Sequence, residues 1–206
     1  MKIGILGGSF NPAHQGHIHI SLQAIKKLNL DQVWWIPTQY NPFKDKSKYL
    51  SHQQRLKDCQ IFVKNYPKIY VKNFAEIYTI KLIKRLQINS RGHEFVWIMG
   101  ADNFENFHRW KNFSQLIMLL PIAIFSRDDY LAKIRKTKAW QIYQSKKIMR
   151  FSPSDCLQKD NVLSGISRRN KYSKSSCSEK LLPNFITINS KKLLISSTQI
   201  RNKTYE

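Results

Sequence analysis

A glycine-rich turn between an apolar strand and a helix constrains the fold of this chain more than any other feature. Residues 4–17 read Gly-Ile-Leu-Gly-Gly-Ser-Phe-Asn-Pro-Ala-His-Gln-Gly-His. The small residues Gly7, Gly8 and Ser9 let the backbone approach a ligand closely, and the amides at the start of the following helix attract an anion. The turn has neither the lysine of a P-loop nor the Gly-x-Gly-x-x-Gly spacing of a dinucleotide fold. We therefore expect a nucleotide phosphate site that contains histidines.

The two histidines of this segment, His14 and His17, are three positions apart, so on the first turn of a helix they face the same side. The glycine turn lies next to them, and this neighbourhood favours contact with a phosphate. Two alternatives stay open. The pair could ligate zinc, although a catalytic zinc site needs a third protein ligand and an open position, or the rings could simply pack within the fold.

Short apolar runs alternate with helical patterns along most of the chain. This alternation predicts an α/β fold with a doubly wound, Rossmann-like parallel sheet and helices on both faces. A Ser-x-x-Gln capping box at Ser51 predicts one of the helix starts. The expected strands are residues 2–6, 32–36, 68–72, 94–99, 122–126, 185–188 and 193–195, and the expected helices are 16–28, 51–64, 79–86, one or two within 103–120, and 196–201, with a weaker helical pattern at 128–147.

Residues 152–183 lack this periodicity and are rich in Ser, Lys, Arg and Asn. A segment of such composition buries too little apolar surface to join a core. We therefore expect a single domain over residues 1–206, with a basic, serine-rich and mobile insertion at about 152–183.

The chain carries 35 basic and 13 acidic residues, which gives a net charge of +22. Such a charge is typical of proteins that bind nucleic acid, and the run Arg168-Arg169-Asn170-Lys171 fits that interpretation. However, lysines are spread over the whole length, and arginine, the usual reader of bases, is scarcer. A general compositional bias is therefore favoured over a specific polyanion contact. In either case the positive field would attract substrates that carry several phosphates.

Cysteine usage and hydropathy indicate the compartment. The three cysteines are scattered, odd in number and without metal-ligand spacing, so neither a disulfide framework nor a zinc ribbon is expected. No stretch approaches the ~20 apolar residues of a membrane span, and the N-terminal apolar run is too short and too rich in glycine for a signal peptide. We expect a cytoplasmic protein with no membrane partner.

Two motifs near opposite ends of the chain resemble those of a known superfamily. Residues 7–17 resemble the first signature of the nucleotidylyltransferases of the His-x-Gly-His type, and Ile-Ser-Ser-Thr-Gln-Ile-Arg at 195–201 resembles their second. Segments between them resemble bacterial nicotinate-nucleotide adenylyltransferase, and the likeness covers roughly residues 1–127 and 184–201. These segments are Trp-Trp-Ile-Pro at 34–37, Asn-Pro-Phe-Lys at 41–44, Tyr-Thr at 78–79, and Trp-Ile-Met-Gly-Ala-Asp-Asn at 97–103 with Trp110.

The resemblance implies that the first motif binds ATP, with two histidines in a catalytic, electrostatic role. A lysine in the loop after the second expected strand is a further candidate for contact with the triphosphate, although a loop lysine in this chain is by default a solvated charge. The residues concerned are Gly8, Ser9 and Phe10 beside the nucleotide, His14 and His17 at its phosphates, and Lys44 in the Asn-Pro-Phe-Lys loop.

The second motif also has the features of an anion site. Ser196 and Gln199 form a Ser-x-x-Gln capping box, which turns the amides of Ser197 and Thr198 outward at a helix N-terminus. Taken alone, this pattern favours an ordinary helix cap. When it is paired with the first motif, the pattern instead favours a site that binds the phosphates of ATP. Arg201, one turn further on, would then clamp phosphate oxygens with its planar, permanently charged group in a catalytic role.

The acceptor nucleotide would lie near the residues that follow a buried strand at 94–99. Asp102 would hold a ribose hydroxyl, because open α/β sheets place ligands at the ends of such strands. The resemblance implies that Trp110 stacks on the pyridine ring and that the backbone at Tyr78 and Thr79 receives the carboxylate, although Trp110 is equally typical of an ordinary core residue. Relatives often have an aromatic residue where this chain has Lys111, which leaves the preference between acid and amide open.

The reaction implied by the resemblance is adenylyl transfer from ATP to nicotinate mononucleotide, which gives nicotinate adenine dinucleotide and pyrophosphate in NAD biosynthesis. A phosphate is already an anionic nucleophile near pH 7, so no catalytic triad is needed. Catalysis would rest on positioning, worth up to ~7–11 kcal/mol, and on cations that stabilise the charge moving onto pyrophosphate. Mg²⁺ would be carried by the ATP phosphates and would keep most of its waters.

Three classes of alternative stay open, one of which is a nucleotide sensor without activity, which turnover would exclude. The same fold could serve another acceptor, such as nicotinamide mononucleotide or phosphopantetheine, or could transfer a cytidylyl group. A protein of a different class, a basic nucleic-acid-binding module, would bind RNA or DNA tightly and with a strong dependence on salt. The interpretation favoured here predicts ATP and nicotinate mononucleotide as partners and only nonspecific contact with nucleic acid.

Overall fold

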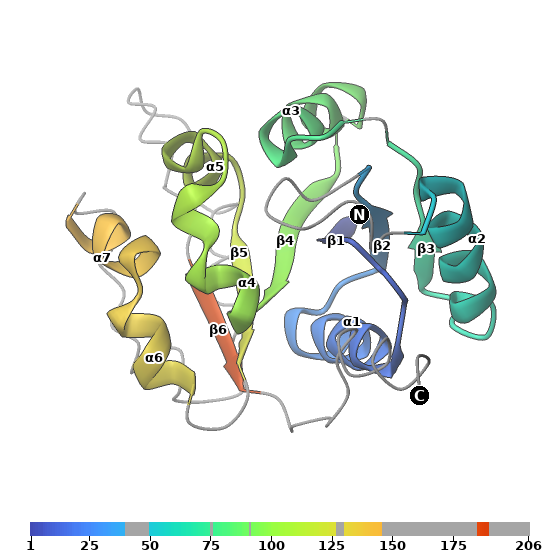
Figure 1. The fold of residues 1–206 in the computed structure, drawn as a ribbon, viewed down its shortest axis with the longest axis horizontal. Coiled ribbons are helices and arrows are strands. Elements are labelled where there is room, and N and C mark those ends of the chain that lie inside the picture. The colour runs from blue at the N-terminus through green and yellow to red at the C-terminus, as the bar shows by residue number, and fades with distance from the viewer. Residues whose placement is uncertain (40–49, 75, 91, 127–129, 146–184, 190–206) are drawn as a thin grey trace.

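Parallel strands form one six-stranded sheet at the centre of the computed structural model, which describes residues 1–39, 50–74, 76–90, 92–126, 130–145 and 185–189 (Figure 1). The strands lie in the order β3-β2-β1-β4-β5-β6, and all neighbouring pairs are parallel. The strands are β1 Lys2–Gly8, β2 Gln32–Pro37, β3 Ile69–Val71, β4 Glu94–Gly100, β5 Ile122–Ser126 and β6 Phe185–Asn189.

Helices cover both faces of this sheet, and each helix layer encloses its own apolar cluster. One cluster joins the sheet to α1 and α2, and the other joins it to the remaining helices. Along β4, Trp97 and Met99 belong to the second cluster, whereas Val96 and Ile98 belong to the first, as the twofold repeat of a strand requires. The helices are α1 Gln15–Leu28, α2 His52–Val63, α3 Thr79–Asn89, α4 Ala101–Glu105, α5 Phe113–Leu119, α6 Tyr130–Lys136 and α7 Lys138–Ser145, with a 3₁₀ helix at Phe107–Arg109.

The fold is therefore the predicted doubly wound α/β sheet. Among the described residues, every expected strand and helix is present within a few residues of its expected bounds. The segment expected to hold one or two helices at 103–120 holds α4, the 3₁₀ helix and α5. The expected strand at 193–195, the helix at 196–201 and the insertion at 152–183 lie outside the described residues.

The capping box expected at Ser51 is half correct. Its hydroxyl accepts a hydrogen bond from the Gln54 backbone N–H at 3.1 Å, so Ser51 does cap α2. The Gln54 side chain does not return to the cap. It donates instead to Asp58 Oδ1 one turn further along the helix at 2.7 Å, because a carboxylate acceptor makes a stronger hydrogen bond.

The chain changes direction across the sheet between β1 and β4. β2 and β4 pair with opposite edges of β1, and the helices that follow β1 and β4 lie on opposite faces of the sheet. Open α/β sheets bind ligands in the crevice that this reversal leaves at the carboxyl ends of the strands. The glycine-rich turn after Gly8 and the start of α4 after Gly100 both lie at the carboxyl ends of these strands, which makes this end of the sheet the candidate site.

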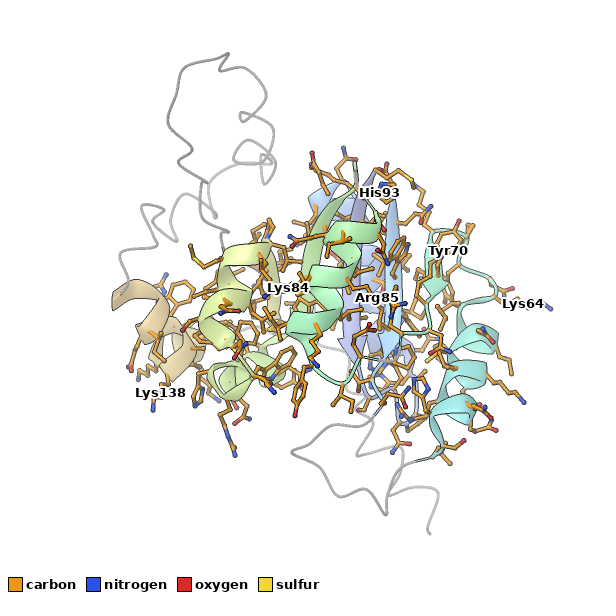
Figure 2. The ribbon with its side chains drawn as sticks, turned by 90° about the horizontal axis from the view of Figure 1, so that it is seen from above. Lys64, Tyr70, Lys84, Arg85, His93 and Lys138 are labelled. Carbon is orange, nitrogen blue, oxygen red and sulfur yellow. The ribbon has the colours of Figure 1, made fainter. Side chains whose placement is uncertain are left out.

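The exposed charge is distributed over separate elements. Figure 2 labels four basic residues, with Lys64 at the end of α2, Lys84 and Arg85 on α3, and Lys138 on α7, and all four are exposed. These four charges therefore do not form one basic patch. Among the described residues, no helix combines the length and the apolar character that crossing a membrane requires.

Candidate active site

The turn after β1 is shaped by what lies directly beneath it. A Cβ at Gly7 would overlap the six-membered ring of Trp97, so only glycine lets β1 pack on β4 at this point. The Gly8 carbonyl accepts hydrogen bonds from Thr38, from the backbone N–H at 2.9 Å and from the hydroxyl at 3.2 Å. The start of the turn is thus tied to the end of β2.

Phe10 lies in this turn with a backbone φ of 45° and a side chain that is 1% exposed. Its ring contacts the ring of His17, with centroids 4.6 Å apart, and stacks on Trp35 at 4.9 Å. Of Phe10, only the backbone is therefore available to a nucleotide. Its side chain instead supports the catalytic candidate His17 from below.

His14 and His17 lie together at the start of α1. His14 is the N-cap of the helix rather than part of its first turn, and the two ring centroids are 3.9 Å apart. The backbone N–H of Gly16 donates to His14 Nδ1 at 3.1 Å, and that of His14 donates to His17 Nδ1 at 3.2 Å. Because each Nδ1 accepts a hydrogen bond, it carries no proton of its own, and the single proton of each neutral ring lies on Nε2.

The surroundings of His17 set its charge. Burial, reinforced by the charge of the neighbouring His14, lowers the pKa of His17 from 6.5 to about 3. At pH 7 this ring is therefore neutral. His17 can therefore offer a phosphate a neutral Nε2–H donor but no full positive charge.

A hydrogen-bonded chain behind the histidines holds the first turn of α1. The indole N–H of Trp35 donates to the Ser21 hydroxyl at 2.8 Å, and that hydroxyl donates to the His17 carbonyl at 2.8 Å. The sequence analysis missed both supporting residues. The spacing of four between His17 and Ser21 was a readable signal for the second contact. The contact with Trp35 comes from another strand and left no local signal.

On the acceptor side, Asp102 lies in the first turn of α4, directly after β4, and is exposed. A Cβ at Gly100 would overlap Asp102 Oδ1, so this glycine leaves room for the carboxylate to fold back over the end of the strand. The structure therefore places Asp102 just past the carboxyl end of β4, as the sequence predicted. Its contact with a ribose stays a prediction.

The structure brings Tyr78 together with the segment that contains Trp110. Tyr78 is the N-cap of α3, with no side-chain hydrogen bond to the cap, and Thr79 is the first residue of that helix. The ammonium group of Lys111 lies 4.2 Å from the centroid of the Tyr78 ring. Trp110 is partly buried and meets the buried Trp97 edge to face at 6.1 Å. Trp110 is therefore partly a core residue and partly a surface residue near Tyr78.

Four of the predicted site residues lie outside the described residues. Lys44 falls in residues 40–49, and the second motif falls in residues 190–206. The roles of Lys44, Ser197, Thr198 and Arg201 at the triphosphate stay predictions.

Comparisons with known proteins agree with this architecture. The family model described as Cytidylyltransferase-like matches residues 5–203. Among solved structures, nicotinic acid mononucleotide adenylyltransferase of Plasmodium falciparum, complexed with NaAD, superposes with a TM-score of 0.64 at 19% identity, over 98% of this chain and 82% of that one. At that identity the superposition shows the fold alone.

Curated relatives add a closer likeness. A protein of Methylorubrum extorquens (strain PA1) named "Probable nicotinate-nucleotide adenylyltransferase" is 38% identical over 152 residues, which cover 72% of this chain and 82% of the relative. A protein of the same name from Rhizobium meliloti (strain 1021) is 37% identical over 131 residues, covering 62% and 69%. This chain therefore belongs to the nicotinate-nucleotide adenylyltransferase family, within the cytidylyltransferase-like proteins.

Proposed function

We propose that this chain transfers the adenylyl group of ATP to nicotinate mononucleotide, giving nicotinate adenine dinucleotide and pyrophosphate in NAD biosynthesis. A 5′-phosphate oxygen of the mononucleotide attacks the α-phosphorus of ATP, and the bond from that phosphorus to the oxygen bridging the α- and β-phosphates breaks. The electron pair leaves with pyrophosphate. The membership of the chain in its family and the geometry at the β1–α1 turn support this assignment.

The histidine pair is the observation on which the proposal depends most. His14 and His17 have their Nδ1 atoms bonded to backbone N–H groups, so both rings carry the Nε2 proton that a phosphate oxygen can accept. Both lie at the N-terminus of the 14-residue helix α1, whose dipole favours an anion. Two oriented donors and a helix N-terminus at the switch point of the sheet form a site for the phosphates of ATP.

The neutral state of His17 defines its role in the reaction. A neutral donor that is already oriented stabilises the charge that develops on the phosphates without reorganising solvent. It also holds the same proton throughout the physiological pH range, because its pKa of about 3 lies far below it. His17 therefore acts by orientation and hydrogen bonding rather than by transferring a proton.

The acceptor would occupy the region between β4 and α3. Trp110 has an aromatic face on which a pyridine ring can stack, and the backbone amides of Thr79 and its neighbours at the start of α3 favour a carboxylate. The Asp102 carboxylate can accept a hydrogen bond from a ribose hydroxyl. These three groups come from different elements that meet at one edge of the sheet. Their joint contact with one nucleotide is part of the proposal.

Nucleotidyltransferases of this family use a divalent cation with their nucleotide. The groups described around the first motif are ring N–H donors and backbone amides, which bind phosphate oxygens rather than a hard cation. This donor set fits Mg²⁺ that is held by phosphate oxygens and water. When bound, Mg²⁺ would neutralise charge on the leaving pyrophosphate. Its identity is part of the proposal, and a cytoplasmic location stays a prediction from the sequence.

The test is a pyrophosphate-release assay in which purified protein and ATP are mixed with one acceptor at a time. We expect nicotinate mononucleotide to give a kcat/KM roughly tenfold or more above nicotinamide mononucleotide, because a carboxylate and an amide differ by a full charge. Faster release with nicotinamide mononucleotide or phosphopantetheine would move the assignment to that acceptor. No release with any acceptor would contradict the assignment as an enzyme.

The His17→Ala variant tests the donor side of the same site. We expect its kcat to fall by roughly 10²–10³ with a smaller change in the KM for ATP, because the lost hydrogen bond is strongest when charge has moved onto the phosphates. Measuring the fold of the variant by circular dichroism controls for unfolding. An unchanged kcat in a folded variant would remove His17 from the mechanism.

A further inference from the structure

Arg55 is a buried cation that the sequence analysis did not single out. It lies on α2, and its side chain is 1% exposed. Its guanidinium group donates hydrogen bonds to backbone carbonyls from three separate parts of the chain. These bonds run from Nη1 to Ser9 at 2.6 Å and to Thr38 at 2.9 Å, from Nη2 to Gln39 at 2.7 Å, and from Nε to Leu50 at 3.1 Å.

Burying a positive charge is costly unless its hydrogen bonds are met. The carbonyls of Ser9, Thr38, Gln39 and Leu50 meet this need for Arg55, and only a guanidinium presents its donors in a fixed planar fork that reaches several acceptors at once. Arg55 therefore connects the turn after β1, the chain that leaves β2 and the start of α2.

The bond to Ser9 has a consequence for the next residue. A trans peptide is planar, and its C=O and N–H point in opposite directions. Because the Ser9 carbonyl points to the Arg55 guanidinium, the N–H of Phe10 in the same peptide points away from it. Within the part of the chain that the structure describes, the Phe10 N–H has no hydrogen-bond partner.

Asn11 provides a second connection between the same two segments. Its side chain is 3% exposed, and its Oδ1 accepts a hydrogen bond from the Leu50 backbone N–H at 3.1 Å. Leu50 is thus bound through its N–H to Asn11 and through its carbonyl to Arg55. The glycine-rich turn and the residue preceding the Ser51 cap of α2 form one hydrogen-bonded unit.

We propose that Arg55 is a positioning residue of the nucleotide site, which turns the Ser9–Phe10 peptide so that the Phe10 amide donates to a phosphate of the nucleotide. This inference rests on the proposed function. The amide would then join the two histidine donors of α1. Arg55 acts through backbone carbonyls and does not touch the substrate, and its positive charge beneath the turn adds to the attraction for a polyanion.

The test compares Arg55→Lys and Arg55→Met with Arg85→Met as the matched control. Arg85 lies on α3 (Figure 2), is exposed, and forms a salt bridge with Glu76 at 2.6 Å, far along the chain from the turn. Initial rates are measured against ATP and against the mononucleotide, with the folded fraction of each variant taken from urea unfolding. Lysine keeps the charge but loses the planar fork.

We expect Arg55→Lys to raise the KM for ATP roughly tenfold to a hundredfold, because a small misplacement of one donor has effects of that size. The KM for the mononucleotide should change by less than about twofold in Arg55→Lys, because Arg55 does not act on the acceptor side of the site. Both KM values of Arg85→Met should also change by less than about twofold, because Arg85 does not hold the turn. Equal effects on both substrates, or a loss of kcat that only follows the folded fraction, would overturn the proposal.

A measurement on the unmodified protein decides the matter if the Arg55 variants do not fold. Inorganic tripolyphosphate is titrated into ¹⁵N-labelled protein, and the amide resonance of Phe10 is followed. We expect it to shift with saturation, and an unmoved Phe10 resonance while other amides of the turn shift would refute the inference. This readout needs no turnover, so it distinguishes failure of this inference from failure of the proposed function.

Discussion

The partly buried, neutral state of His17 predicts a dependence of stability on pH. The pKa of this ring is about 3 in the folded protein, against an ordinary value of 6.5. Between these values the unfolded chain binds a proton at His17 that the folded chain does not bind. The free energy of unfolding therefore decreases as the pH falls below about 6.5, continues to decrease toward pH 3, and has no contribution from this group above pH 7.

The size of this effect follows from the two pKa values. At pH 5 the ring lies about 1.5 pK units below its ordinary value, and each unit corresponds to about 1.4 kcal/mol, so His17 should lower the stability by about 2 kcal/mol relative to pH 8. For comparison, the total stability of a domain is roughly 5–15 kcal/mol. The effect should thus be visible in ordinary denaturation experiments.

The assay is urea unfolding at pH 8, 7, 6 and 5 of the natural protein and of His17→Gln. Glutamine does not titrate, and its side-chain oxygen can still accept from the His14 backbone N–H, as a capping box allows. The difference in unfolding free energy between the two proteins should change by about 2 kcal/mol between pH 8 and pH 5. A constant difference over that range would refute the assignment of a neutral His17 ring with a lowered pKa.

Three further substitutions test the packing around the site. Gly7→Ala should lower the unfolding free energy by about 1–3 kcal/mol in a urea titration, because its Cβ would overlap the Trp97 ring, and an unchanged midpoint would contradict the close approach of β1 to β4. Ser21→Ala leaves the buried Trp35 indole N–H without its acceptor and should destabilise by about 1–3 kcal/mol, whereas Ser21→Thr, which keeps a hydroxyl, should lose less. Trp110→Ala should raise the KM for the mononucleotide more than that for ATP, and a normal acceptor KM would argue against stacking.

Elements with strong local signals were predictable, and long-range contacts were not. The Ser51 cap of α2 and the strand ending at Pro37 could be predicted because capping and proline chemistry depend on a few adjacent residues. Phe10 shows the limit. Its place beside the nucleotide stays a prediction, but the structure shows that its side chain is buried in the core, where the ring contacts His17. Nothing adjacent in the sequence indicates that direction.

Charge was also beyond reach of the sequence. The spacing of His14 and His17 predicted that the rings would lie together, but not that His17 is neutral, because a pKa depends on burial and on neighbouring charges. The sequence also contains no signal for the role of Arg55. Its partners are backbone carbonyls at Ser9, Thr38, Gln39 and Leu50, and carbonyls carry no residue identity.

By itself, the sequence determined the alternation of strands and helices, the doubly wound α/β class and the family to which the chain belongs, because each is encoded in periodicity or in short motifs. The tertiary structure alone decided how the turn after β1 is held, which ring nitrogens of the histidines accept backbone hydrogen bonds, which charge His17 adopts, and that the Ser9 carbonyl points to Arg55. These properties arise where residues distant in sequence exclude water from one another, and local patterns contain no information about that exclusion.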